Sequence, residues 1–410
     1  MSGVYVLGGF QTDFARNAAR EGVGVGELVD ETVRGTLADA GLEASAIEVI
    51  HVGNAFGELF TGQAQLGAMP ATMYPALWGV PGARHEAACA SGSIALLAAA
   101  AELEAGRYDC ALVIGVEQER NVGGEVAARH LGAAAWIGHE AAGVRFVWPQ
   151  MFADIEEAYA ARWGLDRRWL GAIAAQNLGN AKDNPLAQTR AWTFPPEAFT
   201  EDDIANPLVA GRLRRTDCAQ LTDGGAGVIL ASERFARDHA ARRGTAIAAL
   251  ARIRGWGHRT AGLGLGEKLD RSRAPDHLLP HVRAAILDAY RRADLEGPAQ
   301  LDGIETHDCF TITQYLALDH FGLTAPGESW RAVADGRTAR GGALPVNPGG
   351  GLIGIGHPVG ATGVRMFHDA ARQVTGAAGA AQVSGARTFA TLNLGGSGTT
   401  AVSFVLGGAA

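Results

Sequence analysis

The feature that most constrains this chain is an order of predicted elements that occurs twice. Each copy runs from a strand to an amphipathic helix and a second strand, then through a glycine-containing turn to a buried helix and paired strands. The second copy begins after Arg243, and residues 46–51 and 301–306 occupy the same place in the two copies. An internal duplication of one α/β unit therefore explains the 410 residues better than two unrelated domains do.

Hydrophobic periodicity sets the expected elements of each copy. Apolar residues at helical spacing predict helices over residues 27–40, 94–104, 276–292 and 364–374. Short β-prone runs predict strands within residues 4–7, 47–52, 108–116, 220–231, 246–253, 301–306, 388–394 and 400–406. Because strands and helices alternate, we expect a layered α/β fold.

A long stretch between the first set of strands departs from this pattern. It holds five tryptophans and several prolines, and only residues 154–163 and 168–181 have the spacing of helices. A segment of this length must carry structure of its own, so we predict an inserted loop domain that acts as a lid or subdomain. The expected division is an N-terminal half of residues 1–118 and 217–240, a loop domain of 119–216 and a C-terminal half of 241–410.

The charge of the chain argues against nucleic acid as a partner. The net charge is -8 and the pI is about 5.8, whereas phosphate binding requires a concentrated positive surface. The largest basic cluster contains Arg212, Arg214 and Arg215. A solvated loop with an ion pair to Asp217 is favoured for this cluster over a phosphate contact.

The cysteines and the amino terminus bear on the compartment. The four cysteines are widely spaced and form no Cys-x-x-Cys pair, which argues against a zinc site or a redox dithiol. No basic segment followed by an apolar one opens the sequence, and no apolar run approaches the ~20 residues of a membrane-spanning helix. We therefore expect a soluble, cytoplasmic protein with reduced thiols and no membrane contact.

Cys89 is the first candidate for chemistry. It lies at a predicted strand-to-helix turn, where the positive end of the helix would stabilise a thiolate and lower its pKa. The small residues Ala87, Ala88 and Gly92 allow backbone or substrate to approach closely. The alternative is a buried, inert cysteine that packs as a small apolar side chain. The local sequence leaves both interpretations open.

His357 is the second candidate, within the glycine-rich residues 354–363. Glycines at 354, 356, 360 and 363 remove side-chain bulk around the imidazole, so a partner group could approach to the ~2.6–3.2 Å that a general base requires. The alternatives are a histidine hydrogen-bonded within a turn and a glycine loop that cradles phosphate. Because no Gly-Lys-Ser/Thr follows, a nucleotide loop is disfavoured.

The third candidate is the segment His307-Asp308-Cys309-Phe310, which directly follows a predicted strand. Open α/β sheets place their sites at this end of a strand. His307 and Cys309 could ligate a metal, but no second pair accompanies them. Asp308 is expected to cap a helix that starts near Thr311.

Three segments in the same order and spacing resemble the thiolase family. They are Ala87-Ala88-Cys89-Ala90-Ser91-Gly92, His307-Asp308-Cys309-Phe310 and Gly356-His357-Pro358-Val359-Gly360-Ala361-Thr362-Gly363. The His-Asp-Cys-Phe form resembles the sterol-carrier-protein-x and archaeal branch, whereas better-known thiolases have Asn-Glu-Ala-Phe there. The resemblance covers nearly the whole chain. It implies a duplicated, five-layered α-β-α-β-α core with an inserted loop domain.

The resemblance also implies an acyl-CoA C-acyltransferase that makes or cleaves a 3-oxoacyl-CoA through an acyl-enzyme. Cys89 would be the nucleophile, His357 its base, and His307 with His357 the donors to an enolate. Many thiolases carry a second catalytic cysteine in a carboxyl-terminal Cys-x-Gly motif, but residues 391–398 here contain no cysteine. The branch with His-Asp-Cys-Phe transfers that acid/base role to Cys309. Backbone N–H groups of Cys89 and of Gly395 or Gly396 would stabilise the oxyanion.

Further expectations concern ligands and partners. No metal or redox cofactor is implied, and coenzyme A thioesters enter as substrates. The family implies a homodimer or a dimer of dimers, and its branch makes a small OB-fold, zinc-ribbon protein a candidate partner. With only two lysines, the chain would contact CoA phosphates through arginine. The alternatives are a related carbon–carbon bond enzyme for a bulky, aromatic or non-CoA substrate, and a catalytically silent scaffold subunit.

Overall fold

The computed structural model describes residues 3–408 and places their long strands in one nine-stranded sheet of order β3-β2-β4-β7-β1-β8-β11-β10-β9. The halves of this sheet meet only where β1 pairs with β8 over two residue pairs. The strands are β1 Val4–Gln11, β2 Val49–Gly53, β3 Gly82–His85, β4 Cys110–Glu117, β7 Gly224–Ser232, β8 Ala251–Thr260, β9 Gly303–Thr306, β10 Thr388–Gly395 and β11 Thr400–Gly408. A separate small hairpin contains β5 Leu208–Ala210 and β6 Leu213–Arg214.

The sheet topology confirms the duplication. The first half has the order β2-β4-β7-β1 and the second the order β9-β10-β11-β8, with β3 added at one edge. In both halves the first pair is parallel and the next two pairs are antiparallel. Apart from β3, the two halves of the sheet therefore repeat one unit, strand for strand.

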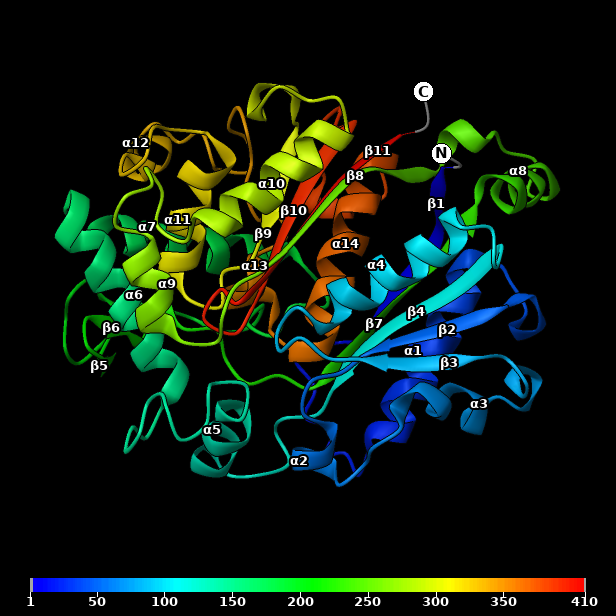
Figure 1. Cartoon of the computed structure of the whole chain (residues 1–410), viewed down its shortest axis with the longest axis horizontal. Coiled ribbons are helices and arrows are strands. Elements are labelled where there is room, and N and C mark those ends of the chain that lie inside the picture. The colour runs from blue at the N-terminus through cyan, green and yellow to red at the C-terminus, as the bar shows by residue number, and fades with distance from the viewer. Residues whose placement is uncertain (1–2, 409–410) are drawn as a thin grey trace.

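Helices complete the layers (Figure 1). Their bounds are α1 Val25–Ala40, α2 Gly57–Thr61, α3 Met69–Met73, α4 Ser91–Glu104, α5 Gly124–Gly132, α6 Val147–Trp163, α7 Arg168–Asn180, α8 Glu233–Arg242, α9 Leu265–Arg271, α10 Pro280–Arg292, α11 Thr311–Phe321, α12 Ser329–Ala334, α13 Gly351–Ile355 and α14 Val359–Thr375. Helices α4 and α14 lie together between the two halves of the sheet, with α1 outside one half and α10 outside the other. The predicted five-layered thiolase-type core is thus confirmed.

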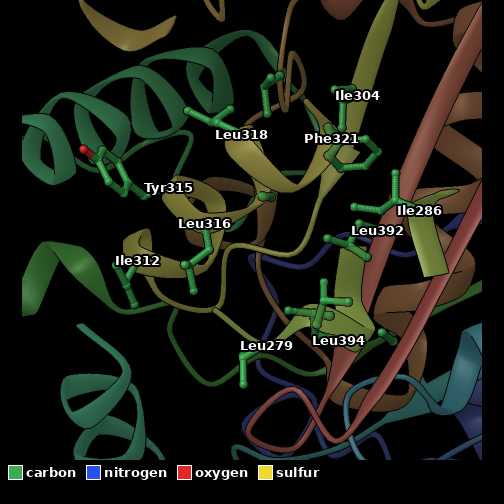
Figure 2. Packing of buried hydrophobic residues seen from close by; sticks show 14 of the residues in the cluster. Leu279, Ile286, Ile304, Ile312, Tyr315, Leu316, Leu318, Phe321, Leu392 and Leu394 are labelled. Carbon is green, nitrogen blue, oxygen red and sulfur yellow. The ribbon is translucent and has the colours of Figure 1, made fainter. Parts of the chain in front are cut away.

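Burial explains the composition of the inner layer. Helix α4 is Ala- and Leu-rich and apolar on all sides because it is covered by β-strands and by α14. The outer helix α10 shows the other pattern, with one buried face and one charged face. Figure 2 shows the outer core of the second half, where Ile286 of α10 and Phe321 of α11 pack with Leu392 of β10. These layers fix the positions of the strand and helix ends that carry the site.

The segment of residues 119–216 forms helices α5, α6 and α7 and the small hairpin. Its base is fastened by a buried ion network in which Arg167 pairs with Glu156 at 2.6 Å and with Asp217. Tyr159 of α6 stacks edge-on against Tyr315 of α11, so the segment packs on the second half. The predicted division of the chain at residues 118, 216 and 240 stays a prediction.

Several predicted elements have other bounds in the structure, and two of these differences are instructive. Residues 246–253 are not one strand, because a 3-10 turn over Ile247–Ala249 precedes β8. The last helix begins at Val359 rather than at residue 364, since glycines at 360 and 363 belong to its first turns. Glycine lowers intrinsic helix propensity, but close packing of this buried helix overrides that preference. Within the described range, 3–408, no helix is both long and apolar enough to cross a bilayer.

Candidate active site

The two central helices begin side by side, and each is preceded by a candidate side chain. Cys89 lies two residues before the first residue of α4, and His357 lies two residues before the first residue of α14. Glycines make this close approach feasible, because a Cβ on Gly92 would lie 2.7 Å from the Gly360 carbonyl oxygen. A Cβ on Gly363 would lie 2.5 Å from the Ser93 hydroxyl. The prediction that glycines 354, 356, 360 and 363 clear space around the imidazole is therefore wrong, because a Cβ on these glycines would meet other neighbours, such as the Val116 carbonyl at Gly360 and Thr222 at Gly356.

A cavity of about 390 Å³ opens over these helix ends. Its wall includes the thiols of Cys89 and Cys309 and the imidazole of His357. Most of the remaining wall is apolar, and its larger side chains include Phe56, Phe146, Trp148, Phe152 and Phe310. Phe152 and Phe310 stack with ring centroids 4.5 Å apart. The geometry favours a ligand with a substantial apolar part whose reactive end meets the two thiols.

Cys89 lies in a tight turn that the adjoining backbone fixes. The Ala88 backbone has a φ of 50°, in the left-handed region that residues with a Cβ seldom occupy. Burial raises the pKa of the Cys89 thiol to about 12, and the field of an ionised Glu119 adds to this rise. Backbone N–H groups, including that of Gly396, act in the opposite direction. The helix terminus was expected to lower the pKa of Cys89, but burial outweighs that effect. Cys89 is therefore a neutral thiol in the resting site.

His357 is held in one tautomer by its neighbours. Its Nδ1 lies 2.6 Å from the Thr362 hydroxyl oxygen, and that hydroxyl donates its own proton to the Pro358 carbonyl at 2.9 Å. The Nδ1 atom must therefore carry the hydrogen, which leaves the lone pair on Nε2. Burial lowers the pKa of His357 to about 3, with Arg365 adding to the effect. A neutral imidazole with a free Nε2 is the form that accepts a proton.

His307 has the opposite tautomer. The Ser93 hydroxyl donates to Asn393 Oδ1 at 2.7 Å, so the Asn393 amide N–H₂ group faces His307 Nδ1 at 3.1 Å and donates to it. The proton of the neutral ring is therefore on Nε2. Burial, then His357 and Arg365, lowers the pKa of His307 well below its ordinary value. The rings of His307 and His357 meet edge to face with centroids 5.2 Å apart.

Cys309 and Asp308 follow β9 but have different surroundings. Cys309 lies in the cavity wall, and burial raises its thiol pKa well above the ordinary value, with Cys89 and Asp308 adding to the effect. The prediction that Asp308 caps a helix near Thr311 is wrong. Its carboxylate instead accepts backbone N–H bonds from Leu352 at 2.6 Å and Ile353 at 3.3 Å. This carboxylate ties the loop after β9 to α13, just before His357.

The glycine turn after β10 touches the Cys89 loop. A Cβ on Gly395 would lie 2.1 Å from the Ala87 carbonyl oxygen, and Gly396 has a φ of 62°. The N–H of Gly396 faces the Cys89 sulfur, whereas Gly395 is paired with Thr400 in the sheet. Of the two predicted glycines, Gly396 is therefore the one whose N–H is directed at the site.

The candidate groups could also be considered as metal ligands. Donor atoms of Cys89, His307 and His357 lie within 4.8 Å of one another. In zinc sites the second nitrogen of a ligating histidine donates a hydrogen bond, as Nδ1 of His357 does to Thr362. His307 does not fit, because its Nδ1 accepts from Asn393 and its Nε2 carries the proton. The absence of a resident metal stays a prediction.

The structure brings the four predicted side chains together, and it adds residues that the sequence did not single out. Thr362 and Asn393 set the two histidine tautomers, and Glu119 lines the cavity. The signal for Asn393 was a single amide within a fully buried strand. The ion pair expected between the arginine cluster and Asp217 is wrong, because Arg167 occupies that carboxylate and Arg214 pairs with Asp203. Arg215 is exposed on the cavity wall.

Comparison with known proteins identifies the family of this arrangement. Residues 4–234 match the family described as "Thiolase, N-terminal domain", and residues 266–408 match "Thiolase C-terminal domain-like". The acetyl-CoA acetyltransferase of Methanothermobacter thermautotrophicus is 33% identical over 402 residues, which cover 98% of each chain. Sterol carrier protein 2 of Homo sapiens is 28% identical over 413 residues, covering 98% of this chain and 71% of that protein.

Solved structures agree on the fold. An Ltp2-ChsH2(DUF35) aldolase has a TM-score of 0.77 at 21% identity, over 99% of this chain and 98% of that one. Human mitochondrial 3-ketoacyl-CoA thiolase in complex with CoA has a TM-score of 0.72 at 15% identity, over 100% and 98%. The chain belongs to the thiolase family and is an acyltransferase. Within that family it falls in the branch of sterol carrier protein 2 and the archaeal acetyl-CoA acetyltransferases, as its His-Asp-Cys-Phe segment predicts.

Proposed function

We propose that this acyltransferase makes or cleaves the carbon–carbon bond of a 3-oxoacyl-CoA through an acyl-enzyme on Cys89. The observation that carries the proposal is the meeting of four groups at one cavity. Donor atoms of Cys89, His307 and His357 lie within 4.8 Å of one another, and Cys309 lies in the same cavity wall as Cys89. Each group has the protonation state that its role requires.

The first half-reaction begins with a neutral thiol and a neutral imidazole. As the Cys89 sulfur attacks the thioester carbon, its proton passes to Nε2 of His357. The N–H groups of Cys89 and Gly396 face the sulfur and would hold the developing oxyanion, each such donor contributing ~3–4 kcal/mol to transition-state stabilisation. The bond from carbon to the CoA sulfur then breaks, and the departing CoA thiolate takes the proton of the Cys309 thiol.

The second half-reaction uses the Cys309 thiolate that remains. It removes an α-proton from a second acyl-CoA, and the enolate oxygen accepts hydrogen bonds from Nε2–H of His307 and of the protonated His357. The enolate carbon attacks the acyl-enzyme and expels the Cys89 thiolate, which recovers its proton from His357. The reverse sequence is thiolytic cleavage. Burial raises the pKa of the Cys309 thiol, which makes its thiolate a stronger base toward the α-proton and so supports this role.

The two thiols are separated by single-turnover experiments. Cys89→Ala should abolish acyl transfer with the fold intact, a loss of about 10⁴-fold or more. Cys309→Ala should still become acylated at Cys89, which intact-protein mass spectrometry detects, but should not form the carbon–carbon bond. Cys218→Ala is the matched control, since Cys218 lines the same cavity and its thiol donates to the Arg214 carbonyl. Full thiolase activity in Cys309→Ala would disprove the acid/base assignment.

The apolar cavity supports a bulky or aromatic acyl group as the substrate class. Phe146, Trp148, Phe152 and Phe310 supply flat apolar surface for such a group. An assay of CoA-dependent cleavage across linear, branched and ring-containing 3-oxoacyl-CoAs tests this extension. A scaffold role predicts no thiol chemistry, so protection of Cys89 from iodoacetamide by acyl-CoA would exclude it.

Three features bear on the binding of CoA and of partner proteins. Arg215 stands exposed on the cavity wall, where it would contact a CoA phosphate. The exposed edge strand β3 offers unpaired backbone groups to a second copy, which supports a homodimer. A structural neighbour is an Ltp2-ChsH2(DUF35) aldolase, which favours a small OB-fold, zinc-ribbon protein as partner here. The cleavage assay, run with and without candidate partners, tests this.

A further inference from the structure

One group in the cavity has no part in the proposed reaction. Glu119 follows β4, and its side chain lines the cavity together with Cys89 and His357 while only 1% of the residue is exposed to bulk solvent. Its Oε1 accepts a hydrogen bond from the Val359 backbone N–H at 3.0 Å, and the Thr222 backbone N–H also donates to the carboxyl. Its own backbone N–H donates to Asp223 at 2.7 Å, which fixes the chain at this point. The carboxyl is therefore held in place rather than mobile.

Comparison with its neighbour Glu117 shows what is unusual. The two oxygens of Glu117 accept hydrogen bonds from the Asn54 amide and from three backbone N–H groups, and Glu117 does not line the cavity. Across residues 3–408, no side chain donates to the Glu119 carboxyl and no cation pairs with it. Glu119 therefore keeps hydrogen-bonding capacity for a molecule within the cavity.

The surroundings favour the neutral form of this carboxyl. Burial raises the pKa of Glu119 well above its ordinary value, and the neighbouring Glu117 and Asp223 add to the rise. A protonated carboxyl has an O–H group to donate, unlike a carboxylate. Glu119 and Cys89 line the same cavity, and in its ionised form Glu119 raises the pKa of the Cys89 thiol, so both groups border the space that an acyl group on that sulfur would occupy.

We propose that Glu119 selects acyl groups that carry a hydroxyl or keto oxygen on the second or third carbon, by donating a hydrogen bond to that oxygen. The inference rests on the proposed acyl-enzyme at Cys89. An unsubstituted acyl chain leaves the buried O–H without a partner, whereas an oxygenated chain satisfies it. The expected preference for an oxygenated chain over its plain counterpart is about 10- to 100-fold.

The test measures acylation of Cys89 by mass spectrometry with butanoyl-CoA, 2-hydroxybutanoyl-CoA and 3-hydroxybutanoyl-CoA. Wild type and Glu119→Gln should both prefer a hydroxylated probe, because the amide keeps a donor and an acceptor in the same place. Glu119→Met keeps the volume but loses the donor. It should react with butanoyl-CoA at least as fast as wild type while its preference falls to about unity. A purely structural role would instead slow all three probes equally and would overturn the inference.

A second measurement does not depend on the methionine variant folding. The infrared C=O band of protonated Glu119 is identified as one that is present in wild type and absent from Glu119→Gln. This band should shift when a hydroxylated acyl group is bound, but not when a butanoyl group is bound. Equal reaction with all three probes in wild type, or an unshifted band, would overturn the inference while leaving the acyl-enzyme intact. Failure of every probe to acylate Cys89 would instead contradict the proposed function.

Discussion

The two halves of the molecule share one scaffold and present different chemistry at equivalent positions. Helices α4 and α14 are counterparts, yet one is preceded by Cys89 and the other by His357. The end of β2 leads to Asn54, whereas the end of its counterpart β9 leads to His307. The end of β4 carries buried carboxyl groups, whereas the end of β10 carries glycine.

This difference teaches how a duplicated fold acquires a site. Symmetry of the backbone brings four strand ends and two helix ends to one place, and it does so in any sequence that keeps the layers. In the proposed reaction the first half supplies the nucleophile, and its β4 end adds buried carboxyl groups. The second half supplies the groups proposed to hold and move protons. The two halves can therefore be compared by experiment, because the proposed reaction assigns their groups different parts in the two steps.

The largest expected effect comes from the side chain that serves both steps. His357→Ala should lower acylation and carbon–carbon bond formation together, each by about 10³-fold, because Nε2 of His357 is the proposed acceptor of the Cys89 proton and a proposed donor to the enolate. Rapid-quench measurement of both steps checks this. His139→Ala is the control, since that imidazole is exposed and stacks on Trp136. Loss of only one step would contradict the dual role.

The next effect concerns the thiol of the first half. Because burial holds the Cys89 pKa at about 12, the thiolate fraction stays small at neutral pH and grows with every unit of pH. Alkylation by iodoacetamide, followed at Cys89 by mass spectrometry, should rise about 100-fold between about pH 7 and pH 9. A plateau near neutral pH would show that the helix terminus outweighs burial and that a thiolate–imidazolium pair exists at rest.

Much of the fold and part of the candidate site could be predicted from the sequence. The order of strands and helices in both halves, the central Ala-rich helix and the pairing of Cys89 with His357 could be predicted, because periodicity and three spaced motifs carry that information. The motifs also predicted the family. Element ends were less predictable, as at Val359, where close packing lets glycines lie within a helix.

Contacts between distant segments could not be predicted. Thr362 and Asn393 fix the tautomers of His357 and His307 only because the sheet brings β10 beside α4 and α14. The pKa of Cys89 was expected to fall because the sequence predicts the helix that follows it. The sequence does not predict the distant segments that bury the thiol and raise its pKa. Asp308 was assigned to the nearest helix, yet its partners lie 44 and 45 residues away.

The tautomer-fixing residues give a smaller effect that sharpens the comparison of steps. Thr362→Val removes the acceptor for His357 Nδ1–H and should slow both steps by about 10- to 100-fold. Asn393→Leu removes the donor to His307 Nδ1 and should slow only carbon–carbon bond formation by a similar factor. Acylation and bond formation are measured separately for each variant. Equal slowing of acylation by Asn393→Leu would show that His307 also serves the first step.

The smallest expected effect lies in the turn that presents Gly396. The ammonium of Lys268 on α9 donates to the Ser397 and Thr399 hydroxyls at 2.7 Å each and to the Leu263 carbonyl at 2.9 Å. Lys268→Met should therefore loosen the turn and lower acylation by about 3- to 10-fold, since misplacement of a donor weakens oxyanion stabilisation. Lys268→Arg should recover part of this loss. An unchanged acylation rate in Lys268→Met would show that sheet pairing alone fixes the turn.

Stability against pH provides a second readout of the same lysine. Burial lowers the pKa of Lys268 to about 8 from its ordinary value of 10.5. Between these values the unfolded chain holds a proton that the folded chain has released, so the free energy of unfolding should rise with pH across this window. The melting temperature of wild type, measured relative to that of Lys268→Met, should therefore increase as pH rises from about 8 to about 10. A constant difference would mean that the lysine keeps its charge, and that three neutral acceptors suffice to hold a buried ammonium beside the catalytic turn.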